Sequence, residues 1–262
     1  MQIEAALNFV PTFVLVFFRL AGLMLFAPLL GSTRVPRRVK TALALVLAMC
    51  MCTNVTQPPV LPQTGAELAL GIGGEMAFGV AMGMILSFVF IAVQWGGEMI
   101  GQQMGLNLSE VFDPQFGASG SLVGEMYFML TTAVFLYIGG HLEMIRAVRL
   151  SFDALPLLSV GMNPDLLDML IKLFTAAATL AMRLAAPVMV TMLVVDLALG
   201  CISKTIPQLN VMSAGLTLRS LVGMVVLIVS IWSTSAVLRA ETTKSIGKMA
   251  EGWTTPAAAV AR

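Results

Sequence analysis

Few side chains in this chain of 262 residues suit catalysis or metal binding. His141 is the single histidine, and its context, GGHLEMIR, lacks a second histidine at i+4, so the spacing of zinc proteases is absent. A serine or cysteine nucleophile needs a nearby base, which one histidine can hardly supply. Cys50, Cys52 and Cys201 lie in or beside apolar runs, as buried free thiols do. We therefore predict no enzyme and no catalytic, cofactor or metal site.

The composition is that of a membrane protein. The chain is 58% hydrophobic and 11% charged, with a mean hydropathy of +0.92, whereas globular domains have roughly 25% charged residues. A net charge of +1 creates no field that would attract nucleic acid. The N-terminal apolar run carries Glu4 and no early Lys or Arg, and it exceeds the roughly 15 residues of a signal-peptide core. We interpret it as an uncleaved first helix.

Apolar segments separated by glycine, proline or charge predict an all-α fold of about six helices. A membrane-spanning helix needs roughly 20 mainly apolar residues. Only residues 76–97 and 220–238 reach about that length without a charge. The predicted segments cover residues 5–31, 41–55, 68–97, 121–140, 170–202 and 211–238.

Charged side chains interrupt several of these segments, and each charge at the centre of a bilayer costs on the order of 3 kcal/mol. We therefore expect them to face protein or water. Lys and Arg near the segment ends are equally numerous on the two sides of a serial bundle, so the positive-inside rule assigns no orientation. Either the segments do not all cross in series, or assembly partners override the rule. The interrupting charges are Arg19, Glu75, Glu125, Lys172, Arg183 and Asp196.

Glycines in the run GIGGEMAFGVAMGM, residues 71–84, recur at helical spacing. Gly79 and Gly83 are four residues apart, which predicts a helix face that another backbone can approach closely. The chain also has 20 methionines, whose flexible side chains suit contact surfaces that fill irregular gaps.

Two kinds of function remain open on the residues alone. A secondary transporter would use charges such as Glu98 and Asp196 and an interrupted helix such as the one around Pro187, but the two halves show no convincing repeat. The other possibility is a subunit of a protein-conducting or structural complex.

Four stretches resemble the FliR family of flagellar type III export-gate proteins. Residues 13–49, FVLVFFRLAGLMLFAPLLGSTRVPRRVKTALALVLAM, closely resemble the opening of that family. Three later stretches follow in the family's order: GQQMGLNLSEVFDPQ, GGHLEMIRAVRLSFDALPL and ISKTIPQLNVMSAGLTLRSLVG. Together they cover about residues 13–224. The chain departs from the family pattern at Glu110, Gly139 and Thr217, which concerns local detail.

The resemblance implies a non-catalytic subunit of the bacterial inner membrane and the flagellar basal body. Such a subunit assembles with FliP-like and FliQ-like proteins, beside an FlhB-like protein, into the gate through which unfolded flagellar proteins leave. It implies membrane-associated helical hairpins in three parts: a FliP-like portion over residues 1–164, a FliQ-like hairpin over 165–240 and a polar C-terminal tail over 241–262. Residues 239–262 are polar and look like a short mobile tail.

The segment GQQMGLNLSEVFDPQFGASG, residues 101–120, is oddly apolar for a connector. In the family interpretation it projects into the channel and helps to plug it, because glycines permit rearrangement and large apolar side chains seal. A surface loop with a few buried anchors is the alternative. The plug residues are Met104, Gly105, Leu106, Val111, Phe112, Asp113, Pro114 and Phe116, with Asp113 before Pro114 favouring a turn.

Two further sets of residues have implied roles. Pro207, Gln208 and Asn210 end one helix and start the next in the FliQ-like hairpin, or contact a partner. A basic edge meets lipid head groups or an acidic neighbour, or is simply solvated. The basic edge consists of Arg34, Arg37, Arg38 and Lys40.

Overall fold

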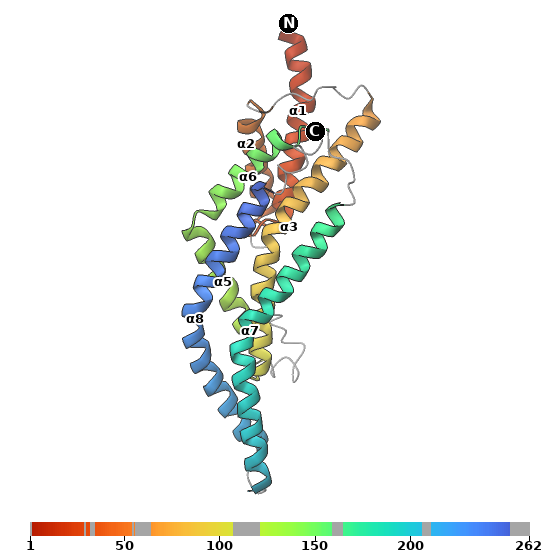
Figure 1. Cartoon of the computed structure of the whole chain (residues 1–262). Helices are drawn as coiled ribbons and strands as arrows, with labels where there is room; N and C mark the ends of the chain where they lie inside the picture. The colour runs from red at the N-terminus through yellow and green to blue at the C-terminus, as the bar shows by residue number, and fades with distance from the viewer. Residues whose placement is uncertain are drawn as a thin grey trace. The chain divides into compact units, whose positions relative to one another are not determined.

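The computed structural model describes residues 2–28, 30–31, 35–53, 55, 64–106, 121–158, 165–205 and 211–251. Every regular element within these ranges is a helix, which confirms the predicted all-α fold (Figure 1). The helices are α1 (Gln2–Phe26), α2 (Arg37–Cys52), α3 (Gly65–Gln103), α5 (Leu122–Tyr137), α6 (Gly140–Ala154), α7 (Asp165–Thr205) and α8 (Val211–Glu251).

Helix α6 was not among the predicted apolar segments. It carries several charged residues, so its mean hydropathy is low, but its buried side chains recur at helical spacing on one face. Gly139, with a φ of 70°, precedes its first residue, and the extended Leu155 follows its last. Arg146 Nη1 lies 2.6 Å from Glu143 Oε1, as expected for oppositely charged residues three apart on a helix.

Helix α8 extends past the apolar segment that predicted it. It continues to Glu251, so the prediction of a tail is wrong for residues 239–251, while residues 252–262 lie outside the described part of the chain. The polar composition concealed a helix whose Thr242, Ser245 and Ile246 are buried at i, i+3 and i+4. Packing on that one face offsets the low hydropathy of the segment.

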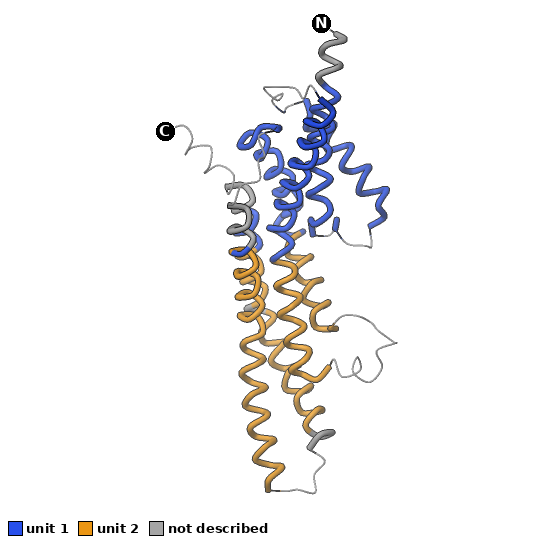
Figure 2. The backbone as a smooth tube through the Cα atoms, turned by 90° about the vertical axis from the view of Figure 1, so that its right-hand side faces the viewer, with its two compact units in different colours: residues 1–88, 136–171, 242–262 blue, residues 89–135, 172–241 orange. Residues whose placement is uncertain are grey.

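The chain divides into two compact units (Figure 2). Unit 1 comprises Met1–Phe88, Leu136–Ile171 and Thr242–Arg262, and unit 2 comprises Val89–Phe135 and Lys172–Glu241. Helices α3, α5, α7 and α8 contribute residues to both units. The predicted division at residue 164 rests on resemblance to FliP-like and FliQ-like proteins and stays a prediction.

In unit 1, α1 crosses the first part of α3 at very short range. A Cβ atom added at Gly79 would collide with the carbonyl oxygen of Arg19, and one at Gly83 would lie 2.7 Å from the carbonyl oxygen of Leu23. On α1, Gly22 is equally close to the backbone at Met76. The predicted packing surface at Gly79 and Gly83 is confirmed, since any side chain there would push the helices apart.

In unit 2, the last part of α3 packs against α5 and α7. A Cβ atom at Gly97 would lie 2.6 Å from the Cα atom of Gly124 on α5, and one at Gly96 would lie 3.1 Å from the carbonyl oxygen of Ala181 on α7. Aromatic rings also pack edge to face in this unit, with ring centroids 5.7 to 6.0 Å apart. The ring pairs are Phe90 with Phe128, Phe90 with Phe135, and Trp95 with Phe174.

Three helices in the described residues are long and apolar enough to cross a membrane: Phe9–Phe26, Gly65–Gln103 and Ile171–Thr205. Two bent pairs, Leu122–Tyr137 with Gly140–Ala154 and Gly215–Ile231 with Thr234–Gly247, raise the number to five if each pair is one span. The three single candidates include the helices of Arg19 and Asp196, so apolar length and internal charge coexist in the same elements.

Candidate functional site

The start of the predicted plug segment is described, and it ends helix α3. Gly105 has a φ of 73°, a conformation that favours glycine. Its N–H donates to the carbonyl oxygen of Gln102 at 3.0 Å, and the N–H of Leu106 donates to the carbonyl oxygen of Gly101 at 3.0 Å. This pair of hydrogen bonds is the Schellman motif, which terminates a helix at a left-handed residue. Gly105 therefore has a definite structural role in ending α3.

Met104 holds this helix end against α8 within unit 2. Its side chain is fully buried, and the Ser220 hydroxyl donates to its backbone carbonyl at 3.1 Å. The Met104 side chain fills the space where a Cβ atom of Gly223 would stand. The remaining plug residues, Val111, Phe112, Asp113, Pro114 and Phe116, lie outside the described part of the chain.

The predicted basic edge coincides with the start of α2. Pro36 precedes the helix, and Arg37 and Arg38 form its exposed first residues. Lys40 is half-buried, and Arg34 lies outside the described residues. The structure thus places three of the four predicted cations on one end of one helix.

Helices α7 and α8 run antiparallel in unit 2. Leu199 contacts Gly215, and one turn further from the connection Arg219 Nη2 lies 2.6 Å from Asp196 Oδ1. Both charged side chains are 40% exposed, and Asp196 Oδ1 lacks a hydrogen bond of normal geometry among the described residues. Pro207, Gln208 and Asn210 lie between Thr205, where α7 ends, and Val211, where α8 begins, and are outside the described part of the chain.

A buried ion pair that the sequence reading did not assign forms the polar centre of unit 1. Arg19 of α1 and Glu75 of α3 are both fully buried, with Nε of the arginine 2.5 Å from Oε2 of the glutamate. Nη1 also donates to the backbone oxygen and to Oγ of Ser151 on α6, each at 3.3 Å, and Nη2 donates to the carbonyl oxygen of Leu155 at 3.2 Å. The prediction that these two charges face protein or water is confirmed, and the surroundings of both are protein.

The surroundings of this pair are apolar and strained at one point. The Arg19 guanidinium lies 4.8 Å from the ring centroid of Phe78 and 4.3 Å from that of Phe152, within cation–π range. The second carboxylate oxygen of Glu75 accepts the N–H of Leu158 at 3.0 Å. Leu158 is a non-glycine residue with a φ of 66°, so the carboxylate fixes a turn that is otherwise unfavourable.

The ion pair is built as a structural connection between α1, α3, α6 and the turn after α6. Both oxygens of Glu75 accept hydrogen bonds, and the guanidinium donates to acceptors on three different residues. Such saturation leaves neither side chain available to bind a substrate. The sequence marked Arg19 and Glu75 separately, because each is a charge within an apolar segment. No spacing rule predicts that these two residues form a pair.

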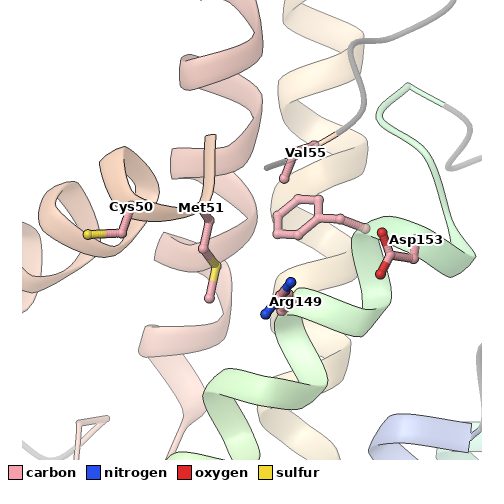
Figure 3. A pocket seen from close by; sticks show the side chains of 6 residues that line it. Cys50, Met51, Val55, Arg149 and Asp153 are labelled. Carbon is pink, nitrogen blue, oxygen red and sulfur yellow. The ribbon is translucent and has the colours of Figure 1, made fainter. Parts of the chain in front are cut away.

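A cavity of about 210 Å³ lies between the end of α2 and α6 in unit 1. Figure 3 shows Cys50 and Met51 of α2 on one side and Arg149 and Asp153 of α6 on the other. Cys52 on the same helix is buried, and loss of solvation raises the pKa of its thiol. No cluster of three or more His, Cys, Asp or Glu side chains suited to a metal occurs in the described ranges.

Known proteins resemble this chain over most of its length. The family described as bacterial export proteins, family 1, matches residues 10–244. The flagellar biosynthetic protein FliR of Bacillus subtilis (strain 168) is 30% identical over 229 residues, which are 86% of this chain and 88% of the relative. FliR of Escherichia coli (strain K12) is 30% identical over 205 residues, 78% of each chain. The surface presentation of antigens protein SpaR of Shigella flexneri is 28% identical over 218 residues, 82% of each.

The long apolar helices and their buried or paired charges define the chain as a helical membrane protein. The family match extends over far more than half of the chain and includes both units. The chain belongs to the FliR family of bacterial export proteins. The resemblance seen in the four sequence stretches is thereby confirmed.

Proposed function

We propose that this chain is a non-enzymatic subunit of the flagellar type III protein export gate and forms part of the channel for unfolded flagellar proteins. The observation that carries the proposal is the match to bacterial export proteins over residues 10–244, together with relatives named for flagellar biosynthesis. A small-molecule transporter is not retained, because the same stretch of sequence aligns with export proteins.

Assembly with FliP-like and FliQ-like subunits, beside an FlhB-like subunit in the bacterial inner membrane, is part of this proposal. The antiparallel pair α7 and α8 supports a FliQ-like hairpin over residues 165–240. The partly exposed charges of Asp196 and Arg219 support packing of this pair against other subunits, because acyl chains accommodate charges poorly. Large apolar side chains are also exposed on the same two helices. They include Val190, Leu193, Val194, Leu197, Leu221, Val225, Ile228 and Val229.

The segment 101–120 acts in this proposal as a plug of the closed channel. Two features of the described residues support that role. Helix α3 ends sharply at Gly105, and Met104 anchors this end on α8 through Ser220 and Gly223. A segment that closes a channel needs a fixed point of attachment, and this helix end provides one.

Deletion of the gene tests the export role. We expect loss of motility and of secretion of hook and filament proteins, with recovery when the gene is restored, and we expect the chain to copurify with FliP-like and FliQ-like proteins. A strain that swims and secretes normally would refute the proposal. Loss of a different secreted set with normal flagella would instead indicate the secretion system suggested by the SpaR relative.

Deletion of residues 106–116 tests the plug separately. Leakage of small molecules through the assembled gate should rise, because apolar side chains that close the channel are removed. Deletion of residues 252–262, which is equally long, is the matched control and should leave leakage unchanged. Normal assembly with unchanged leakage after the 106–116 deletion would contradict the plug role while leaving the export role intact.

A further inference from the structure

Helix α2 exposes most of its apolar circumference within unit 1. Only Ala44, Ala48 and Cys52 are buried, each four residues after the one before, so a narrow stripe of small residues faces the rest of the unit. Several of the other side chains on the helix are bulky and apolar. Those most exposed are Val39, Leu43, Leu45, Val46 and Met49, with exposed fractions of 37 to 65%.

The charges of α2 are all positive and all at one end. Arg37 and Arg38 are exposed at its start, Lys40 follows, and no Asp or Glu occurs in residues 37–52. From residue 42 to residue 52 no side chain is charged. The helix is therefore an apolar rod with a cationic end.

The side chains on the exposed face favour lipid over another protein as its neighbour. Helices that pack together in membranes approach through small residues. In α2 the buried stripe uses Ala44 and Ala48, and the exposed face is mainly bulky, with Ala42 and Cys50 as smaller exposed residues. The exposed surface of α7 and α8 differs, because it includes the partly exposed charges of Asp196 and Arg219, which acyl chains accommodate poorly.

The length and the cations of α2 specify how it meets the membrane. Its 16 residues extend over about 24 Å, less than the roughly 30 Å of a hydrocarbon core. A helix of this length that enters the apolar layer does not cross it, so its charged end can remain at the surface. Arginines at that level attract anionic head groups.

We propose that α2 is a lipid-facing helix whose exposed apolar side chains contact acyl chains while Arg37 and Arg38 bind the head groups of anionic phospholipid. The proposal selects one of the alternatives for the basic edge. It does not depend on export activity, because lipid contact is measured directly.

Photo-crosslinking in the bacterium that encodes the chain tests this contact in the native assembly. Benzoylphenylalanine would replace Val39 or Val46 in α2 and, for comparison, Leu193 in α7. After irradiation the chain is purified and its adducts are identified by mass spectrometry. We expect phospholipid adducts at Val39 and Val46 and protein adducts at Leu193. Protein adducts at Val46 would overturn the proposal.

The anionic preference has its own test at Val39, beside the arginines. We expect anionic phospholipid among its adducts to be enriched about fivefold or more over the bulk membrane. The double variant Arg37→Gln/Arg38→Gln should bring this ratio to that of the bulk. The matched control Arg146→Gln/Lys204→Gln removes two exposed charges elsewhere and should keep the enrichment. No enrichment in the unmodified chain, or the same loss in the control, would refute head-group binding.

Discussion

The two units bring helices together with different chemistry at their centres. In unit 1 a fully buried arginine and glutamate connect α1, α3 and α6, and two aromatic rings cover the guanidinium. In unit 2 the corresponding contacts are glycines against backbone and aromatic rings packed edge to face, while the ion pair between Asp196 and Arg219 is partly exposed. The close glycine crossing is common to both units, and the buried charge belongs to unit 1.

The glycine contacts and the buried ion pair constrain the packing of helices in different ways. A glycine crossing sets the distance between two helices but tolerates small sliding movements. A buried ion pair with fixed hydrogen bonds accepts one register only, because a shift leaves a charge unpaired in an apolar interior. We therefore expect the stability of unit 1 to depend strongly on single polar residues. We expect the stability of unit 2 to depend on glycines at the helix crossings.

Glu75→Gln should have the largest effect, because it leaves the buried Arg19 without its counter-charge. We expect a loss of about 3–5 kcal/mol in the free energy of unfolding, measured on the purified chain in detergent. The double variant Arg19→Met/Glu75→Leu should lose less than the two single variants together, since no lone charge remains. Additive losses would show that the pair is not coupled and would remove the contrast between the units.

Gly97→Ala comes next and tests the feature that both units share. Its Cβ atom would meet the backbone of Gly124, and we expect a loss of about 1–3 kcal/mol, with a similar loss for Gly79→Ala in unit 1. Gly73→Ala is the matched control on the same helix, since nothing lies within 4 Å of its added Cβ. It should stabilise by up to about 1 kcal/mol. Equal behaviour of Gly73 and Gly97 would mean that close approach is unimportant.

Asp196→Asn should have a smaller effect, although its ion pair is about as short as the buried pair of Arg19 and Glu75. Both partners are 40% exposed, so solvent screens the attraction and the expected loss is below about 1 kcal/mol. Arg146→Gln, which breaks the exposed pair with Glu143, should lose about 0.3–0.5 kcal/mol. A loss at Asp196 comparable with that at Glu75 would show that unit 2 also relies on charge for its fold.

Much of the fold could be predicted because hydropathy and spacing are local properties. The apolar lengths of the segments around α1, α3 and α7 predicted these helices. The spacing of Gly79 and Gly83 predicted a packing face. Helix α6 and the end of α8 were missed because their apolar residues occupy one face only and the average hydropathy is low. In both, burial of that face outweighs composition.

The candidate site could be predicted less completely. The glycines around Gly105 indicated a connector that can rearrange, but not that Gly105 ends helix α3. The anchoring of this helix end by Ser220 joins residues more than 100 positions apart. The same holds for Arg19, which was expected to face protein or water but was not recognised as the partner of Glu75. No periodicity connects such residues, because their distance depends on how helices cross.

The sequence by itself determined that this is an all-helical membrane protein of the FliR family, since apolar length, internal charges and four ordered motifs are properties of the chain. Only the tertiary structure decided which charges neutralise one another, which glycines touch backbone and which apolar faces remain uncovered. The physical reason is that burial and pairing are properties of two or more elements together. The sequence of a helix indicates that the helix forms, but the elements packed against it determine which of its faces are buried, paired or exposed.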